Sequence, residues 1–398
     1  MRFRYNRLAA VALAAALAGT TAACGGNGSS APESASAQDF GPYSAQRPDG
    51  KYDQGANRAR GMITESLRLG ERVVFGSEIA PEVSAERYAD VIVGERGLPG
   101  IQLHQAAAAQ PFNPYGGFTA EAADIPYLGE HLKQPLVKVT LIAFPDEPSA
   151  AAAAAAMESA DFALNGSNTP VSVPEFPAAL SHWIPSYADI GSWMAYKSVV
   201  ISVIAETREP KLDQLTALLT KTYQQQVRKL ADYNPVALGD LESLPFDRDK
   251  LLTRLVSTGD NLPDARKFAV YGPRMYAAMT SSNPADVARE YADQGVEAVA
   301  VSDNKYLFKL RDADTAKSFT SYLTDTPTVS RYVRMDGLSG AGEVACFRAA
   351  APNPTEPQAR RFRCLVPHSS FVAEVFSDQE ADVRQLAAAQ YALMKDGE

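Results

Sequence analysis

The fold is decided by Val137-Lys-Val-Thr-Leu-Ile-Ala-Phe144, a strand-sized apolar run that leads through Asp146 into an alanine-rich helical stretch. The same succession returns at Tyr306-Leu-Phe-Lys-Leu310, which leads through Asp312 into a helix expected from about Thr315 to Leu323. Apolar runs of this length are typical of buried strands, and an acidic residue just before a helix caps its first free amides. A strand followed by a capped helix is therefore predicted at matching places in both halves of the chain.

Further segments correspond in the same order. Two more strand-to-helix pairs match: Val199 to Ala205 with the helix Leu212 to Val227, and Phe371 to Phe376 with the helix Ala381 to Met394. Pro81 to Asp90 matches Pro284 to Asp293, because each is expected to begin a helix at proline and each contains Tyr-Ala-Asp. We interpret the order as a diverged tandem duplication, with chance recurrence of common strand-to-helix transitions as the alternative.

These elements predict an α+β protein of two related domains, each a mainly antiparallel sheet covered by helices. Hairpin connections such as Asp303-Asn304 favour this over a doubly wound parallel sheet. The unbroken run Ala150 to Ala156 in a helix expected at 149–164 indicates a helix lying close against a sheet. Proline and glycine interrupt the pattern near 234–247, so we expect an N-terminal domain at 47–235 and a C-terminal domain at 246–398.

The first residues have the pattern of a lipoprotein signal peptide, expected at 1–23. Three arginines precede the apolar stretch Leu8 to Ala18, and Thr21-Ala22-Ala23 places small residues before Cys24. Cys24 is then expected to carry diacylglycerol on its sulfur and to anchor the chain to the membrane. The alternative is an ordinary secreted protein whose cleavage site adjoins a cysteine. Residues 24–46 are rich in Gly, Ser, Ala and Pro and are expected to form a disordered tether.

The charge balance limits the classes of partner. The signal removes 3 of the 38 basic residues and none of the 47 acidic ones, so the mature chain carries 35 − 47 = −12. An acidic surface argues against nucleic acid and against attraction to anionic headgroups. Attachment to the membrane should therefore come from the lipid on Cys24, which places the protein on the outer face of the cytoplasmic membrane.

Two cysteines remain once Cys24 is lipidated. Cys346 and Cys364 lie in strand-like runs separated by a proline-rich loop, in a chain expected to be exported to an oxidising compartment. We predict that they form a disulfide across neighbouring strands. A metal or redox pair is the alternative, although the spacing is not CxxC.

Motifs of catalysis and of cofactor binding are missing from the sequence. It contains no Gly-x-Ser-x-Gly, no phosphate-binding glycine loop, and no metal-ligand spacing among His104, His131, His182 and His368. Ser302-Asp-Asn-Lys305 matches the Ser-x-x-Lys of penicillin-recognising enzymes, but its flanks predict a hairpin rather than the helix that this chemistry uses. We therefore assign no catalytic residues, no metal site and no cofactor.

Two aromatic clusters are candidate ligand-binding residues. Phe112, Tyr115 and Phe118 fall in one segment rich in turn formers, and Trp183 and Trp193 fall close together further along. Exposed aromatic side chains often bind partners or glycans. In an α+β domain the same residues serve equally well as core, and both interpretations stay open at this point.

The chain resembles a family of uncharacterised actinobacterial cell-envelope lipoproteins. The shared features are the lipobox at Cys24 with its Gly/Ser tether, Tyr43 at the start of the mature domain, Arg58 to Glu71, Val73-Val74, Glu78-Ile-Ala-Pro81, and the pair Cys346 and Cys364. The resemblance implies an envelope location and no known activity. We expect a non-catalytic binding or scaffold lipoprotein whose partner is an envelope protein or a glycan. A solute-capturing lipoprotein of a transporter and an envelope hydrolase with a site assembled from distant residues are the alternatives.

Overall fold

The computed structural model describes residues 39–93, 97–125, 134–259, 261–325, 332–351 and 360–396. Gln38–Glu398 form one compact unit that contains two β-sheets. The expected signal peptide, Cys24, the first part of the tether and His131 lie outside the described residues.

The N-terminal sheet has seven strands in the order β1-β2-β3-β7-β6-β5-β4, and every neighbouring pair is antiparallel. Its strands are β1 (Ala85–Val91), β2 (Gly116–Ala123), β3 (Leu136–Ala143), β4 (Thr169–Val171), β5 (Leu180–Trp183), β6 (Asp189–Tyr196) and β7 (Val199–Glu206). Its helices are α1 (Arg58–Gly70), α2 (Gly76–Ile79), α3 (Leu103–Ala109), α4 (Glu147–Phe162) and α5 (Leu212–Leu230), with short 3-10 turns at Lys51–Asp53, Pro81–Val83 and Gln110–Phe112.

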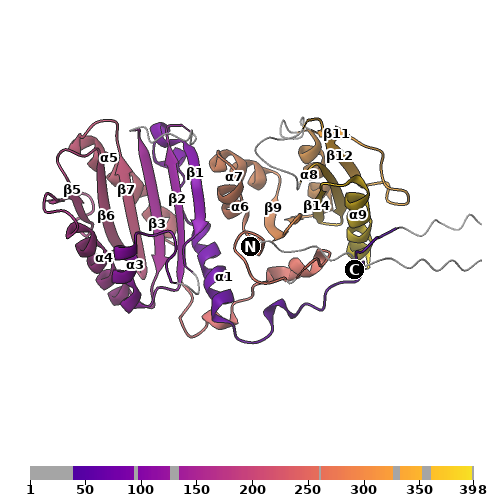
Figure 1. Ribbon diagram of the computed structural model, residues 1–398, viewed down its shortest axis with the longest axis horizontal. Helices are drawn as coiled ribbons and strands as arrows, with labels where there is room; N and C mark the ends of the chain where they lie inside the picture. Colours follow the sequence, from indigo (N-terminus) through magenta and orange to yellow (C-terminus); the bar gives the residue numbers. More distant parts are fainter. Residues whose placement is uncertain are drawn as a thin grey trace, which may run out of the picture. The chain divides into compact units, whose positions relative to one another are not determined.

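The C-terminal sheet repeats this topology in the order β8-β9-β10-β14-β13-β12-β11. Figure 1 labels its strands β9, β11, β12 and β14. Its strands are β8 (Phe268–Tyr271), β9 (Val296–Ser302), β10 (Lys305–Leu310), β11 (Tyr332–Arg334), β12 (Ala345–Ala349), β13 (Phe362–His368) and β14 (Phe371–Ser377). Its helices are α6 (Pro273–Thr280), α7 (Pro284–Asp293), α8 (Ala313–Asp325) and α9 (Glu380–Lys395). Short 3-10 turns at Leu241–Ser243, Arg248–Lys250 and Leu252–Arg254 connect the two domains. Adding seven to each N-terminal strand number gives the C-terminal order, so the predicted pair of related α+β domains is confirmed.

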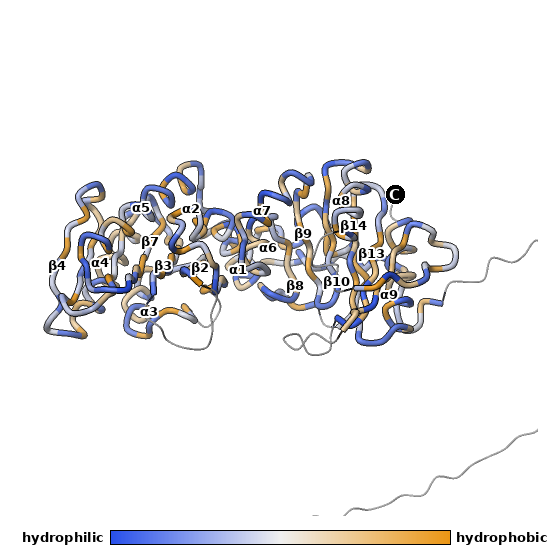
Figure 2. Tube along the Cα trace, turned by 90° about the horizontal axis from the view of Figure 1, so that it is seen from above, coloured by the Kyte–Doolittle hydropathy of each residue, from blue (hydrophilic) through white to orange (hydrophobic). Residues whose placement is uncertain are grey.

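The strand-to-helix transitions form as the sequence predicts. Asp146 accepts a hydrogen bond from the Ser149 amide at 2.7 Å at the start of α4, and Asp312 accepts one from the Thr315 amide at 2.8 Å beside α8. The buried alanines of α4 let this helix pack closely against the sheet. Apolar residues gather along the strands of both sheets, whereas the connecting turns are mostly hydrophilic (Figure 2).

A buried glutamine occupies the same place in both domains. Gln226 of α5 accepts from the Val74 amide at 3.0 Å and donates to the Arg72 carbonyl at 2.8 Å. Gln390 of α9 makes the same pair of bonds, at 3.0 and 2.7 Å, to two backbone groups that are likewise two residues apart. Buried backbone groups need partners, and each amide satisfies two of them in a segment that leads into its domain.

The strand registers give a second equivalence. In the N-terminal domain Ser181 of β5 lies directly opposite Ser192 of β6, and their buried hydroxyls are 2.7 Å apart. In the C-terminal domain the same two strand positions hold Cys346 and Cys364, which form a disulfide with Cα atoms 4.1 Å apart. The predicted disulfide is therefore present, at a site where the other domain uses a hydrogen bond.

One of the proposed correspondences is wrong. Pro284–Asp293 forms helix α7, but Tyr88, Ala89 and Asp90 lie in strand β1, where they pair with β2. Pairing with a neighbouring strand overrides the weak helix preference of a short segment.

The last part of the range expected to be a disordered tether, from Asp39 on, packs against the folded body. From Asp39 the chain lies along α9, where the Tyr43 hydroxyl donates to Asp382 at 2.7 Å and Gln385 donates to Asp39 at 2.8 Å. Phe40 and Tyr43 pack against the core, so they supply the apolar contact that a disordered segment lacks.

Candidate functional site

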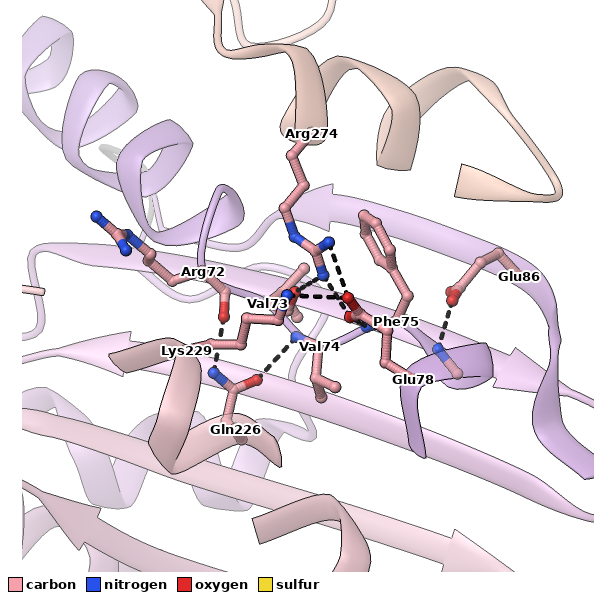
Figure 3. Close-up of polar contacts among 10 residues, drawn as sticks. Arg72, Val73, Val74, Phe75, Glu78, Glu86, Gln226, Lys229 and Arg274 are labelled. Atoms are coloured by element: carbon pink, nitrogen blue, oxygen red, sulfur yellow. Dashed lines mark hydrogen bonds and ion pairs between the residues drawn. The ribbon is translucent and has the colours of Figure 1, made fainter. Parts of the chain in front are cut away.

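A group of charged side chains between the two domains surrounds Glu78 of α2 (Figure 3). Arg274 of α6 donates to its two carboxylate oxygens at 3.1 and 2.5 Å, and Lys229 of α5 donates to Oε1 at 2.9 Å. The Phe75 amide donates to Oε2 at 2.8 Å. Arg274 also donates to the Val73 carbonyl at 2.7 Å, so one guanidinium joins the C-terminal domain to both main chain and side chain of the N-terminal domain.

Electrostatics and ring contact hold this group together. Burial by itself would raise the pKa of Glu78, but the hydrogen bonds and charges of Arg274 and Lys229 outweigh it and hold the pKa below its ordinary value. The Arg274 guanidinium also lies 3.6 Å from the centre of the Phe75 ring, within reach of a cation–π interaction. Glu78 therefore stays ionised, as a two-point partner for arginine.

A second carboxylate caps helix α6 from the other domain. The Met275 amide in the first turn of α6 donates to Glu71 Oε1 at 2.6 Å, and the N-cap residue Gly272 has no side chain that could do this. A Cβ on Gly272 would lie 2.4 Å from the Glu71 carboxyl carbon, so a side chain at this position would displace the Glu71 carboxylate. Burial raises the pKa of Glu71.

Glu86 is a third carboxylate in this region, and it is buried. Its Oε1 accepts from the Gly76 amide at 2.7 Å, and its own amide donates to the Ser282 carbonyl at 3.1 Å. Burial raises the pKa of Glu86 to about 7, against the opposing hydrogen bond from Gly76. We call Glu71, Glu78, Glu86, Lys229 and Arg274 the domain joint.

The domain joint has the chemistry of a structural contact. It brings together carboxylates, cations and backbone groups that hydrogen-bond to one another, while the buried Nε of Arg274 has no hydrogen-bond partner among the described residues. Among the residues that the structure describes, no group of three or more His, Cys, Asp or Glu side chains could hold a metal ion. No helix in the described ranges is long and apolar enough to cross a bilayer. The sequence carries no signal for this joint, because its members come from five separate segments.

The aromatic candidates lie mostly in the core. Trp193 and Tyr115 are each 1 % exposed and Phe118 is fully buried, whereas Phe112 and Trp183 are half-buried. Phe118 of β2 and Trp193 of β6 lie three strand spacings apart, roughly 14 Å, so the two clusters do not meet. Burial favours the core interpretation over ligand binding for Tyr115, Phe118 and Trp193.

Ser302 and Lys305 lie on the predicted hairpin, opposite each other at the ends of β9 and β10. Both are buried, at 1 % and 0 % exposure, and Lys305 donates to Thr258 and, at 3.2 Å, to Asn304. Burial lowers the pKa of Lys305 to about 8. Neither side chain presents a nucleophile to the surface.

A surface hollow of about 560 Å³ lies beside the start of α5 in the N-terminal domain. Its cations are largely neutralised locally, because Lys211 pairs with Glu209 at 2.8 Å and Arg208 pairs with Asp124. The hollow is therefore not a strongly cationic site.

Comparison with family models matches residues 52–246 to the domain of unknown function (DUF7373) N-terminal and residues 251–397 to its C-terminal counterpart. The chain belongs to the DUF7373 family. The domain joint thus links the DUF7373 N-terminal domain, through Glu78, to Arg274 of the DUF7373 C-terminal domain. The resemblance to a family without known activity is confirmed to this extent.

Other comparisons add little about the DUF7373 domains. No curated protein sequence matches the chain. A solved structure, the extracellular domain of PknH from Mycobacterium tuberculosis, is similar at 11% identity and a TM-score of 0.28, covering 41% of this chain and 96% of that one. A similarity of this size does not establish a shared fold.

Proposed function

We propose that the protein is a lipid-anchored, extracytoplasmic binding or scaffold protein of the cell envelope that performs no catalysis. The observation that carries the proposal is the Cys346–Cys364 disulfide. Disulfides persist in oxidising compartments and are rare in the cytosol, so the bridge supports export. The lipobox supports the anchor, since Cys24 is the one cysteine outside the disulfide and follows a signal-like stretch.

The domain joint supports a scaffold over solute capture. A protein that closes two lobes around a solute needs an interface that opens and closes. Here Arg274 ties Glu78 and Val73 across the interface by direct hydrogen bonds, and the hollow beside α5 belongs to the N-terminal domain alone. The proposed partner is an envelope protein or a glycan, and the net charge of the mature chain makes nucleic acid unsuitable.

Cys24→Ala should abolish lipidation, because only the cysteine thiol can accept the diacylglycerol. The variant should fail to label with a fatty-acid probe and should leave the detergent phase on phase separation. Ser29→Ala, in the segment that follows, is the matched control and should label like the unaltered protein. A fatty-acid label on the Cys24→Ala variant would contradict the anchor.

The hydrolase alternative predicts a reactive serine, and we expect none. Fluorophosphonate and β-lactam probes should leave the purified native protein unlabelled, because Ser302 is buried in a hairpin beside buried Lys305. A known serine hydrolase serves as the positive control for the probes. Labelling that disappears in Ser302→Ala would overturn the non-catalytic assignment.

A further inference from the structure

Two of the histidines meet on one aspartate in the N-terminal domain, away from the domain joint. His104 at the start of α3 contacts Asp161 of α4, with His104 Nε2 and Asp161 Oδ1 2.6 Å apart. His182 of β5 contacts the other oxygen of Asp161, with Nε2 to Oδ2 at 3.1 Å. Gln105 of α3 also donates to Asp161 Oδ1, at 2.8 Å. One carboxylate therefore joins two helices and a strand.

The second ring nitrogen of His182 also faces a carboxylate. Its Nδ1 lies 3.0 Å from Glu158 Oε1, and Glu158 is one helical turn before Asp161. A neutral imidazole carries one N–H, so one of these two contacts would set a lone pair against an anion. The protonated ring donates to both. The side chain of His182 is only 6% exposed, which limits replacement of a lost donor by water.

Two aromatic rings enclose the imidazole. His182 stacks on Trp193 with centroids 5.3 Å apart and planes 21° apart, and Phe162 meets it edge-on at 5.3 Å. The face of an indole ring attracts a cation. Buried Trp193 therefore favours the charged form of His182.

The titratable groups around His182 come from three other elements. Glu158 and Asp161 face it from α4, and His104 on α3 shares Asp161 with it. Asp189 on β6 adds a further negative charge near Asp161, and burial raises its pKa. The neighbouring strand β4 contributes no titratable side chain.

The electrostatic balance agrees with the geometry. Burial by itself would lower the pKa of His182, but hydrogen bonds to Asp161 and Glu158 outweigh it and raise the pKa. Burial would raise the pKa of Asp161, but hydrogen bonds from His182, Gln105 and His104 hold it at about 2. The carboxylate thus stays ionised in acid while the imidazole stays protonated.

We propose that His182 is the proton-binding residue of a pH-responsive latch that holds α3 and α4 against β5. Below the pKa of an unfolded histidine, about 6.5, the latch is fully closed. As pH rises through the higher pKa of the folded state, His182 releases its proton to solvent and loses one of its two donors, so the latch loosens.

The C-terminal domain provides an internal reference. The strand registers place Phe347 of β12 where β5 has His182, so the related domain has the same topology without the imidazole. Helix α8 of that domain should therefore lack the pH response of α4.

Hydrogen–deuterium exchange of the mature chain, corrected for the intrinsic pH dependence of exchange, tests the latch. Between pH 6 and pH 9 the opening equilibrium of α3 and α4 should rise roughly tenfold or more relative to α8, because one hydrogen bond to a charged group is lost. His182→Gln should remove this dependence. The control His368→Gln, in the C-terminal domain, should retain it.

An NMR titration of the imidazole signals of the unaltered protein tests the proposal without a variant. The His182 signal should titrate with a midpoint above the value of about 6.5 for an unperturbed histidine, and Glu158→Gln should shift that midpoint down. A midpoint at or below that value overturns the latch. So does a pH dependence of α3 and α4 that survives in His182→Gln.

Discussion

Replacing Arg274 with methionine is expected to lower the free energy of unfolding by about 2–3 kcal/mol, because hydrogen bonds to charged groups contribute about 1.5–3 kcal/mol. The variant removes the guanidinium from the face of the Phe75 ring, and among the described residues it leaves Lys229 as the cation hydrogen-bonded to Glu78. It also leaves the Val73 carbonyl without this donor. Urea denaturation of the mature protein, followed by circular dichroism, measures the change.

The matched control is Arg289→Met in α7. Arg289 pairs with Asp286 within one helix and is 66% exposed, so its loss should change stability by less than about 1 kcal/mol. Arg274→Lys should recover only part of the stability, because an ammonium cannot make the bidentate contact with Glu78. Equal effects of Arg274→Met and Arg289→Met would show that the domain joint adds nothing to stability.

Removing the Cys346–Cys364 bridge should lower the stability of the C-terminal domain by about 3 kcal/mol. The two cysteines are 18 residues apart, and closing a loop of that size restricts the unfolded chain by about this amount. The double variant Cys346→Ser with Cys364→Ser is well suited, since it recreates the serine pair found at Ser181 and Ser192 in the other domain. Denaturant unfolding with and without reductant provides the measurement.

The N-terminal domain serves as the control for the bridge. Its exchange protection should be the same in the serine variant and in the unaltered chain, because it contains no cysteine from residue 52 to residue 246. Unchanged stability of the C-terminal domain after loss of both cysteines would contradict the assigned contribution. Two free thiols in the native exported protein would contradict the disulfide itself.

Local sequence patterns predicted much of the fold. The apolar runs of β3 and β10, each followed by an aspartate cap, identified the repeating unit because a strand and a cap depend on residues close in sequence. Prediction from local patterns failed at Tyr88-Ala89-Asp90. The same tripeptide belongs to helix α7 in the C-terminal domain, but here it lies in strand β1. There the pairing with β2, which is remote in sequence, decided the conformation.

The candidate sites show the same division. The cysteine pair was predictable, because the expected compartment is oxidising and both cysteines fall on neighbouring expected strands. The aromatic clusters were ambiguous, because Trp193 is equally suited to a core and to a binding surface until its exposure is known. No sequence motif marks the pair Arg274–Glu78 or the pair His182–Asp161. An ion pair requires only two opposite charges that lie close together, and the distance between them is set by folding.

By itself, the sequence predicted the two α+β domains, the repeated strand-to-helix transitions and the bridged cysteines, since periodicity, capping and the cysteine positions on expected strands are written in neighbouring residues. Only the tertiary structure decided the identical strand order of the two sheets, the domain joint and the enclosure of His182 between two carboxylates and Trp193. These three features depend on contacts between segments that are far apart in the sequence. In such contacts burial changes the free-energy cost of a charged group, and a shift of a few ångströms decides whether a hydrogen bond forms.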